Sequence, residues 1–391
     1  MREGWEYKKL GDVCQVSAGQ GAPQGEENYS DVGIPFVKAG NLVELINGKQ
    51  ESDIQKVSDE VAKAHRLVLY KTGSVVFAKS GMSCMKGHVY TLKNDCYVVS
   101  HLAILQPRNI SSAYLNYYLQ YHKPQNLIKD EGYPSISLKD IANSIISLPS
   151  NIEQENRVVS ELDKINELIR LKKEQLKDYD NLAQSIFYEM FGDPVENQKG
   201  WEERTMQDLC VNIVDCPHST PKKVDYITDY PCIRTSELRG GSISWATMQY
   251  LDEDEYNIRI ARLKPEAGDI VFGREGTIGD AVILPLGYNF SLGQRTMLLR
   301  ADTSIVSNVF LHRTILSDWI KHQIEYVNVS STVAHVNIKD FKKFTVPLPP
   351  LPLQQLFAKR IELIEQQKAE IQTTIADLET LLASRMQYWF D

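Results

Sequence analysis

Two long segments of the chain carry apolar residues in steps of alternately four and three positions. This spacing predicts a helix whose apolar side chains form one stripe, as in a coiled coil. Each segment lacks internal Gly and Pro and follows a Pro-containing entrance, LPSN at Leu148 and VPLPPLPLQ at Val346. We therefore expect two continuous helices. The stripe positions are Val158, Leu162, Ile165, Ile169, Lys172, Leu176, Tyr179, Ala183, Ile186 and Met190 in the first helix, and Phe357, Ile361, Ile364, Lys368, Ile371, Ile375, Leu378, Leu382, Arg385 and Trp389 in the second.

Neither predicted helix is able to bury its stripe alone, so we expect the two to pack against each other in antiparallel fashion. About 35 residues at 1.5 Å each make a rod roughly 50 Å long. The first helix is expected to end at FGDP, where Gly192 serves as the cap and Pro194 prevents continuation.

The rest of the chain is an internal repeat. GWEYKKLGDVC at Gly4 returns as GWEERTMQDLC at Gly200, and PFVKAGNL at Pro35 returns as PCIRTSEL at Pro231. GSVVFAKSG at Gly73 is matched by GDIVFGREG, and ISLKDI by VNIKDF. A duplication that keeps its order predicts two similar modules and two similar targets, or one pseudo-symmetric target.

Each module alternates short β-branched or aromatic runs with Gly-rich turns. The runs are Ser74 to Ala78, Tyr97 to Leu105, Asp269 to Gly273 and Met297 to Arg300, and helical patches are expected at Ala113 to Tyr121 and Val309 to His322. The predicted class is α+β, with two mixed α/β domains, two long antiparallel coiled-coil helices and a pseudo-two-fold repeat. The predicted domains are residues 1–150, 151–192, 193–350 and 351–391.

Composition places the chain among globular proteins. It has 391 residues, 42% hydrophobic and 24% charged, and we find no run of about 20 apolar residues such as a membrane span needs. The start, MREGWEYKKL, lacks the apolar core of a signal peptide. Six cysteines without a CxxC pair predict free thiols. We expect a cytoplasmic protein with no membrane contact.

The net charge of −8 argues against a strong non-specific polyanion binder. Between Glu153 and Gly192 there are nine acidic and six basic residues, and between Leu353 and Asp391 six and four. The helices thus carry most of the excess, and a local basic face on the modules stays possible.

Motifs for covalent chemistry are missing from the sequence. It lacks GxxxxGK[ST], a GxGxxG opening a helix, GxSxG, HExxH and the Asn/Asp-Pro-Pro-aromatic tetrapeptide of amino-methyltransferases. Cys84 with His88, and Cys216 with His218, each supply two candidate ligands where a closed zinc site needs four. We predict no metal and no catalytic residue.

Matched positions in the two modules carry side chains of the kinds that pair with base edges in the major groove. Lys38 and Asn41 correspond to Arg234 and Glu237, Lys79 and Ser80 to Arg274 and Glu275, and His101 lies near the slot of Gln294 and Arg295. Different side chains at matched positions are what two different half-site readers would show; the alternative is ordinary solvated loops. The predicted DNA-binding residues are Lys38, Asn41, Lys79, Ser80, His101, Arg234, Glu237, Arg274, Glu275, Thr277, Gln294, Arg295, His335 and Lys339, with Thr332 and Asn337 as weaker candidates.

Taken together, the ordered repeat and the two helices resemble the specificity (S) subunit of Type I restriction-modification systems. The resemblance spans the chain and is carried by the two Trp motifs, by GDIVFGREGTIGDA and DCPHSTP, by IKDFKKFTVPLPPLPLQ, and by SIFYEMFGDP and SRMQYWFD at the helix ends. The first module departs from the pattern with AKSGMSCMKGHVYTL. Residue roles therefore transfer more safely to the second module.

The resemblance implies that each module reads one half of a bipartite double-stranded DNA site and that the helices space the modules. Two methyltransferase (M) subunits and the restriction-translocase (R) subunits would join the helices, with S-adenosylmethionine, ATP and Mg on these partners and no cofactor in this chain. The predicted subunit-interface residues are Leu162, Ile165, Ile169, Leu176, Ile364, Ile371, Ile375 and Leu378. A separation of ~50 Å is about one and a half turns of B-DNA, which predicts two half-sites around an unread spacer.

Three alternatives stay open from the sequence. The modules could hold an unrecognised active site, or the chain could be a coiled-coil scaffold that does not read DNA. It could also serve a fused or methylation-only restriction-modification system. The bases read, the spacer length, the existence of an R subunit and the stability of the chain without M subunits are not determined by the sequence.

Overall fold

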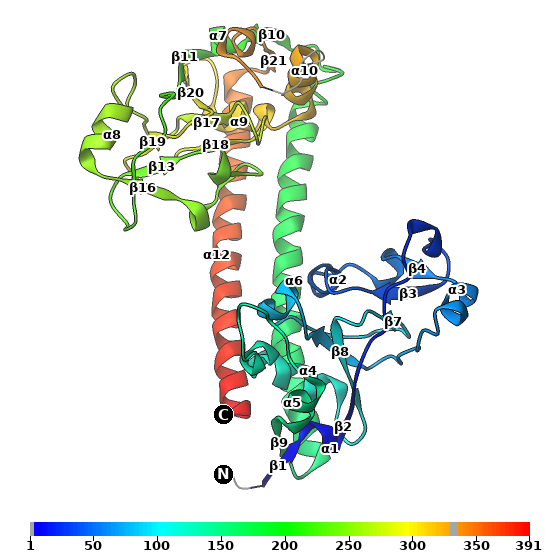
Figure 1. Ribbon diagram of the computed structural model, residues 1–391. Coiled ribbons are helices and arrows are strands. Elements are labelled where there is room, and N and C mark those ends of the chain that lie inside the picture. The colour runs from blue at the N-terminus through cyan, green and yellow to red at the C-terminus, as the bar shows by residue number, and fades with distance from the viewer. Residues whose placement is uncertain (1–3, 329–334) are drawn as a thin grey trace. The chain divides into compact units, whose positions relative to one another are not determined.

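The computed structural model describes residues 4–328 and 335–391 and divides into two compact units (Figure 1). The first unit comprises residues 1–173 and 373–391, and the second comprises residues 174–372. Each unit contains one copy of the repeated module and parts of both long helices.

In the first unit a four-stranded antiparallel sheet, in the order β2-β8-β5-β6, lies beside a three-stranded sheet in the order β4-β3-β7. Within the three-stranded sheet β3 and β7 run parallel. A further sheet is the antiparallel pair of β1 and β9. The strands are β1 (Trp5–Lys9), β2 (Cys14–Ala18), β3 (Ile34–Val37), β4 (Lys56–Val57), β5 (Val75–Ala78), β6 (Val89–Thr91), β7 (Tyr97–Val98), β8 (Leu102–Pro107) and β9 (Ile145–Pro149). The helices of the module are α1 (Leu10–Val13), α2 (Asn41–Ile46), α3 (Asp59–Ala64), α4 (Ser112–Tyr121) and α5 (Leu138–Asn143).

The second unit repeats this topology. Its sheets run β11-β20-β17-β18 and β12-β16-β13-β19, with β13 and β19 parallel, and β10 pairs with β21. The strands are β10 (Glu202–Thr205), β11 (Cys210–Asp215), β12 (Lys223–Val224), β13 (Pro231–Ile233), β14 (Leu238–Arg239), β15 (Ser242–Ile243), β16 (Gln249–Leu251), β17 (Ile270–Gly273), β18 (Ala281–Ile283), β19 (Ser291–Leu292), β20 (Thr296–Ala301) and β21 (Thr345–Leu348). The helices are α7 (Met206–Leu209), α8 (Glu253–Arg259), α9 (Asn308–Ile315), α10 (Asp318–Asn328) and α11 (Ile338–Phe341).

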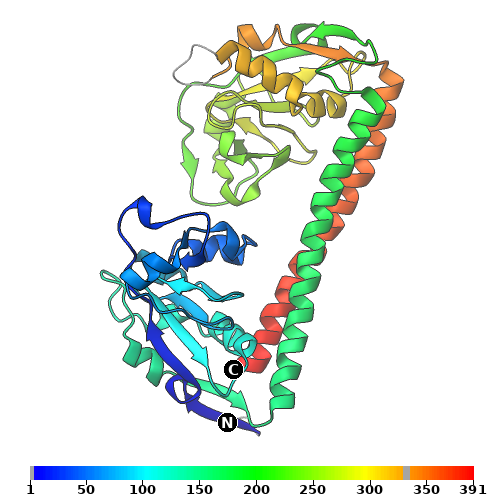
Figure 2. The same ribbon diagram turned by 90° about the vertical axis from the view of Figure 1, so that its right-hand side faces the viewer.

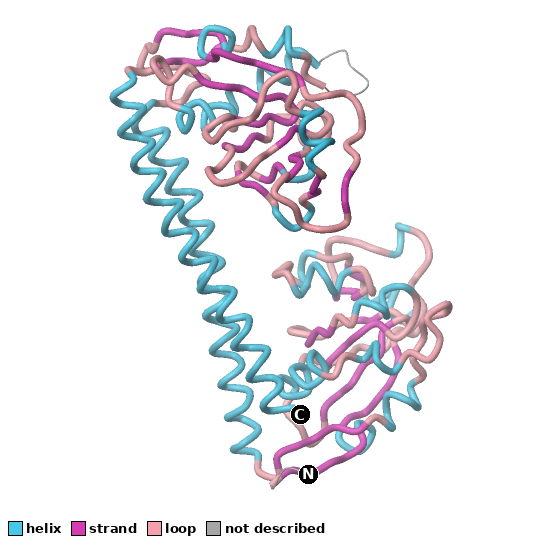
Figure 3. Tube along the Cα trace, turned by 90° about the vertical axis from the view of Figure 1, so that its left-hand side faces the viewer, coloured by secondary structure: helices cyan, strands magenta, loops and turns pink. Residues whose placement is uncertain are grey.

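The repeat in the sequence is therefore a repeat of fold, and the predicted α+β class is confirmed. Strands gather in each module, beside the helical segments (Figure 3). The second module adds β12 and the β14–β15 hairpin to the shared plan, and its α8 follows β16 as α3 follows β4 in the first module. Short 3₁₀ turns complete both modules, at Glu26–Asn28, Glu51–Asp53, Met82–Lys86 and Pro124–Leu127 in the first and at Thr235–Glu237 and Trp245–Thr247 in the second.

The two predicted long helices are present as α6 (Ile152–Phe191) and α12 (Leu351–Phe390), each 40 residues long. In the first unit Glu161 pairs with Arg385, and Lys173 Nζ lies 2.8 Å from Glu379 Oε1. In the second unit Lys368 Nζ lies 2.8 Å from Asp180 Oδ1. Partner numbers on α12 fall as those on α6 rise, so the helices are antiparallel, with the red end of α12 beside the first turns of α6 (Figure 2).

Each module core is completed by both long helices. In the first unit Val158 and Leu162 of α6 and Trp389 and Phe390 of α12 belong to the module's apolar core. In the second unit Phe187 and Phe191 of α6 pack with Phe310 of α9 and Phe357 of α12, at ring-centroid distances of 4.8 to 5.9 Å. The module and the helix ends therefore form one folding unit in each case.

Equivalent polar contacts fix each module on the first turn of its own long helix. The buried Glu155 of α6 accepts a hydrogen bond from the Ser111 backbone N–H at 2.6 Å. The buried Gln354 of α12 accepts one from the Ser307 N–H at 2.8 Å. Ser111 and Ser307 are the N-caps of α4 and α9, whose first N–H groups have no partner within their own helix.

Two expected segments differ from the structure. The run from Tyr97 to Leu105 is two strands, β7 and β8, because the chain turns between them and Val99 N–H bonds Val37. The patch from Val309 to His322 is two helices, α9 and α10. The Ser317 hydroxyl donates to the Thr314 carbonyl at 2.6 Å, and this local bond replaces continued helical bonding at the break.

His312 is a buried histidine on α9. Its Nε2 lies 2.9 Å from the Ala281 carbonyl oxygen, and because a carbonyl only accepts, Nε2 carries a proton. Burial disfavours the imidazolium and lowers the pKa of His312 from 6.5 to about 4. The folded protein therefore holds His312 neutral at pH values where the unfolded chain protonates it.

We predict that the free energy of unfolding falls as the pH drops from 6.5 toward 4, because only the unfolded state takes up this proton. The loss should reach about 2 kcal/mol by pH 5. The variant His312→Gln keeps an Nε2 donor without the titration, so its thermal unfolding should depend less on pH, while exposed His65→Gln should behave as the wild type. Equal pH dependence in His312→Gln and the wild type would contradict this assignment.

Candidate nucleic-acid interface

In the first module several strand ends are tied together by backbone hydrogen bonds. The Lys79 N–H donates to the His101 carbonyl at 2.9 Å, and the Ile136 N–H donates to the Lys79 carbonyl at 2.7 Å. The Val99 N–H donates to the Val37 carbonyl at 3.0 Å, directly before Lys38. The predicted residues Lys38, Lys79 and Ser80 therefore follow strands, and His101 directly precedes β8, where these strand ends meet.

The second module repeats these bonds one for one. The Arg274 N–H donates to the Arg295 carbonyl at 2.9 Å, the Val336 N–H to the Arg274 carbonyl at 3.1 Å, and the Gly293 N–H to the Ile233 carbonyl at 2.7 Å. The pattern makes Arg295 the counterpart of His101, which the sequence left between Gln294 and Arg295. We call this meeting point the strand-end site of each module.

The residues Asn41 and Glu237 share a structural role. Asn41 Oδ1 accepts a hydrogen bond from the Lys38 N–H at 2.9 Å, and Glu237 Oε2 accepts one from the Arg234 N–H at 2.9 Å. Both side chains thus close the turn that follows an inner strand of the sheet, β3 in the first module and β13 in the second. In the sequence, the difference between Asn and Glu is a sign of two modules that read different half-sites. In the structure, both side chains close the same turn.

The Glu237 side chain is also buried, so it is not accessible to a DNA base. Its side chain is 0% exposed, and its carboxylate accepts hydrogen bonds from the Ser236 hydroxyl at 2.8 Å, the Thr247 hydroxyl at 2.9 Å and Arg234 Nη2 at 2.7 Å. A direct base contact by Glu237, as predicted, is not supported by this geometry. Glu237 instead orients the Arg234 guanidinium.

Arg274 also differs from its prediction. Its side chain is 12% exposed, pairs with Asp215, and donates from Nε to the Val336 carbonyl at 2.9 Å. These contacts join the ends of β17 and β11 to the segment before α11. Thr277 is similarly engaged, since its hydroxyl donates to the Thr235 carbonyl at 3.0 Å.

A polar pocket of about 400 Å³ opens at the strand-end site of the second module. It brings together three predicted residues, Arg234, Gln294 and Arg295, and its remaining lining residues are Thr220, Pro221, Lys223, Thr235, Ser236 and Gln249. Gln294 Nε2 donates to the His218 carbonyl at 2.6 Å. Arg295 is 63% exposed, and Glu275 Oε2 lies 3.2 Å from its Nε at the rim.

Arg295 adopts a backbone conformation that non-glycine residues rarely hold. Its φ is 66°, in the left-handed region. Such strain is concentrated at functional sites, where the surrounding structure maintains it. The exposed Arg295 side chain at the pocket rim therefore marks the pocket as the candidate site of this module.

Two glutamines of the strand-end sites escaped the sequence prediction. Gln249 faces Cys232 across the β13–β16 pair, and the Phe36 N–H donates to the Gln55 carbonyl at 2.9 Å at the matching position of the first module. Lys38 Nζ donates to Gln55 Oε1 at 2.7 Å, and Gln249 lines the pocket with Arg234. Only strand register relates these residues, because the intervening loops differ in length.

The remaining candidates lie before and on α11. His335 is exposed, and its N–H donates to Asn328 Oδ1 at 2.9 Å. Asn337 is the N-cap of α11 and accepts from the Asp340 N–H at 2.9 Å, and Lys339 is exposed on the same helix. Thr332 lies outside the described residues.

Cations of the second strand-end site are paired within the module. Arg234 pairs with Glu237 at 2.7 Å, Arg295 with Glu275 at 3.2 Å, Lys223 with Asp225 at 3.9 Å, and Arg274 with Asp215. The site thus presents directed donors with little uncompensated positive charge. Such a site suits hydrogen bonding to base edges better than attraction of a polyanion.

Most of the predicted subunit-interface residues are buried inside the chain itself. Leu162, Ile165, Ile169, Ile364, Ile371 and Ile375 are at most 8% exposed, and Leu176 and Leu378 are half-buried. Their heptad spacing serves the intramolecular seam, which leaves little of their surface for a partner. The six buried positions therefore belong to the seam between the chain's own two helices.

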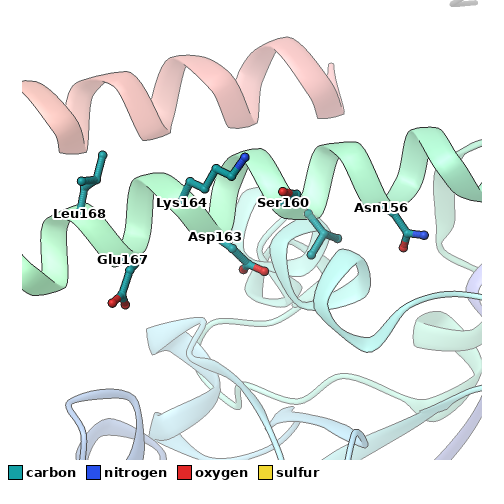
Figure 4. Close-up of a pocket in the computed structure, with 7 residues that line it drawn as sticks. Asn156, Ser160, Asp163, Lys164, Glu167 and Leu168 are labelled. Carbon is teal, nitrogen blue, oxygen red and sulfur yellow. The ribbon is translucent and has the colours of Figure 1, made fainter.

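Other faces of the helices remain open. On α6, Asn156, Ser160, Asp163 and Glu167 line a hollow of about 640 Å³, and Lys164 points toward the neighbouring helix (Figure 4). Asp163 accepts a hydrogen bond from the Tyr117 hydroxyl at 2.6 Å. The exposed leucines of the long helices are Leu168, Leu171, Leu182, Leu356, Leu363 and Leu381.

All six cysteines are free thiols, as expected. Burial raises the pKa of the Cys14 and Cys210 thiols to about 12, so both remain protonated. Residues 4–328 and 335–391 contain no group of three side chains suited to hold a metal ion. Over the same ranges, no helix has both the length and the apolar composition of a membrane span.

The family model of the Type I restriction modification DNA specificity domain matches the chain twice, over residues 2–178 and 198–380. The chain therefore belongs to the Type I restriction-modification DNA specificity family, which confirms the resemblance found in the sequence. Its two modules are the DNA-recognition domains of this family.

Individual relatives agree with this assignment. The chain is 31% identical to the Type I restriction enzyme MjaIX specificity subunit of Methanocaldococcus jannaschii over 156 residues, 38% of this chain and 34% of the relative. It is 19% identical to the MjaVIII specificity subunit of the same organism over 392 residues, 93% of this chain and 86% of the relative. The crystal structure of a Type I S subunit from M. genitalium shares the fold, with a TM-score of 0.56 and 12% identity over 99% of this chain and 96% of that one.

The structural role of Arg274 generates a prediction. Arg274→Met leaves the Asp215 carboxylate, 18% exposed, without its guanidinium partner, so the variant should lose about 2 to 4 kcal/mol of unfolding free energy. The loss should appear in thermal unfolding without DNA. Arg295→Gln, at an exposed side chain, is the matched control and should stay within about 0.5 kcal/mol of the wild type. A stable Arg274→Met variant that has lost DNA binding would restore the reading role.

Proposed function

We propose that this chain is the sequence-reading, non-catalytic subunit of a Type I restriction-modification complex. Each module reads one half of a bipartite DNA site, and the antiparallel helices set the unread spacer between the halves. The observation that carries the proposal is the repeated strand-end site. The two modules share its backbone bonds and differ in the side chains that it presents.

The charge distribution supports recognition of a DNA sequence over non-specific attraction to the DNA backbone. The cations of the second strand-end site pair with carboxylates, in a chain of net charge −8. Non-specific DNA affinity depends on uncompensated Lys and Arg that displace counterions from phosphates. A site with directed donors and little free charge gains its affinity for DNA from hydrogen bonds to matched base edges. The partner subunits supply the contacts to the phosphates.

The long helices would dock the partner subunits. The exposed leucines, 45 to 63% accessible, lie outside the intramolecular seam and offer apolar surface to two methyltransferase (M) subunits. Methyl transfer from S-adenosylmethionine to adenine then belongs to the M subunits. ATP- and Mg-dependent translocation and cleavage belong to the restriction (R) subunits, wherever a complex contains them.

Modified-base sequencing tests the proposal in cells that carry the partner M subunit with and without this chain. Methyl-adenine should appear at a gapped two-part motif only when the chain is present. If the two proteins co-purify and no new mark appears, the chain is a scaffold that does not read DNA.

Spacer length provides a second prediction. Seven residues added to α6 between Leu162 and Leu182, with seven added at the facing turns of α12, lengthen the pair by about 10 Å. The methylated motif should gain about three base pairs of spacer, at ~3.4 Å each, with both half-sites unchanged. A five-residue addition to both helices is the control, because it turns the apolar stripe beyond the insertion by about 140° and should abolish methylation. A changed half-site in the seven-residue variant would contradict the division of labour between helices and modules.

A further inference from the structure

The Arg234 guanidinium in the pocket of the second module is held in one orientation. Its Nε and Nη2 donate to Glu237 at 3.2 and 2.7 Å, and Nη2 also donates to the Thr247 carbonyl at 2.9 Å. A two-point contact between a planar guanidinium and a carboxylate fixes the plane of both groups. The orientation of the Arg234 side chain is therefore fixed, unlike that of a lysine or arginine on a solvated loop.

The support beneath Arg234 is itself fixed. Glu237 is fully buried and accepts hydrogen bonds from Ser236, Thr247 and the Arg234 backbone as well. Gly293 leaves the space through which the Arg234 side chain passes, because a Cβ at Gly293 would collide with Arg234 Cγ. Held by two elements, the guanidinium needs little reorganisation when it binds a ligand.

One end of the guanidinium remains available. Arg234 is 27% exposed and lines the 400 Å³ pocket beside Gln249, Gln294 and Arg295. Its Nη1 has no hydrogen-bond partner within residues 4–328 and 335–391. Glu237 compensates the positive charge of the Arg234 guanidinium. Arg234 therefore presents a directed hydrogen-bond donor, and its contact with a phosphate would amount to little more than one hydrogen bond.

Guanine is the base that fits such a donor. Its major-groove edge presents two acceptors, N7 and O6, and arginine is its commonest specific partner. We propose that Arg234, positioned by Glu237, is the specificity-determining residue of the second module and reads a guanine in that module's half-site. This inference rests on the proposed function and adds a residue and a base to it.

The first module supplies the matched control. Lys38 occupies the place of Arg234, with Asn41 closing its turn and Gln55 accepting from its Nζ at 2.7 Å. Its ammonium also lies 4.1 Å from the centre of the Tyr29 ring. Lys38→Gln should therefore change only the other half-site.

The test is modified-base sequencing of cells that carry the M subunit with the wild type, Arg234→Gln or Arg234→Lys. Arg234→Gln should lose the requirement for one guanine in one half-site, while the other half-site, read by the first module, stays unchanged and shows that the complex has assembled. Binding of the purified complex to the original site should weaken roughly 10- to 100-fold with an unchanged salt dependence. Arg234→Lys keeps the charge beside Glu237 and loses the planar group that Glu237 orients, so it should show reduced discrimination at the same guanine.

Two results would overturn the inference. In the first, both variants keep the wild-type motif. In the second, Arg234→Gln weakens binding equally for all sequences and lowers the salt slope by about one, as expected of a phosphate contact. Absence of any gapped motif with the wild-type chain is a different failure, since it removes the proposed function itself.

Discussion

The two long helices can fold only if their apolar stripes are buried. A helix as long as α6 or α12 exposes its stripe unless another element covers it, and an antiparallel partner covers the stripe along its length. The ends of the pair then enter the module cores, through Trp389 and Phe390 in the first unit and Phe187 and Phe191 in the second. Neither module has a complete core without both helices, so helix pairing and module folding are coupled.

The two copies of the module share their backbone geometry but differ in the side chains at matched positions. The bonds of Lys79 and Ile136 in the first module recur at Arg274 and Val336 in the second. Because these bonds use main-chain groups, they constrain side-chain identity little. A scaffold of this kind allows the residues at the strand ends to diverge while the fold stays the same, which suits a protein whose two halves read different sequences.

Much of the fold was predictable because periodic patterns reflect local physics. The heptad spacing and the flanking Pro and Gly192 placed both long helices within a few residues of their observed ends. Buried central strands such as β5 and β17 followed from their β-branched and aromatic runs. The break between α9 and α10 was missed because it is a local turn, in which the N–H and the hydroxyl of Ser317 both bond the Thr314 carbonyl.

The candidate site was predictable only in part. Matched positions identified Arg234 and Lys38, yet sequence does not distinguish a side chain that faces DNA from one that closes a turn, as Asn41 and Glu237 do. Gln249 was missed since strand register, rather than a constant offset, relates it to Gln55. The heptad leucines and isoleucines were assigned to a partner although the chain's own seam already buries most of them.

Exchanging one module shows whether the two modules read DNA independently of each other. Residues 1–150 would be replaced by the first module of another specificity subunit, and methylated motifs would be sequenced in cells that carry the M subunit. Independent modules should give one altered half-site, with the other half-site and the spacer unchanged. Alteration of both half-sites would contradict independent reading.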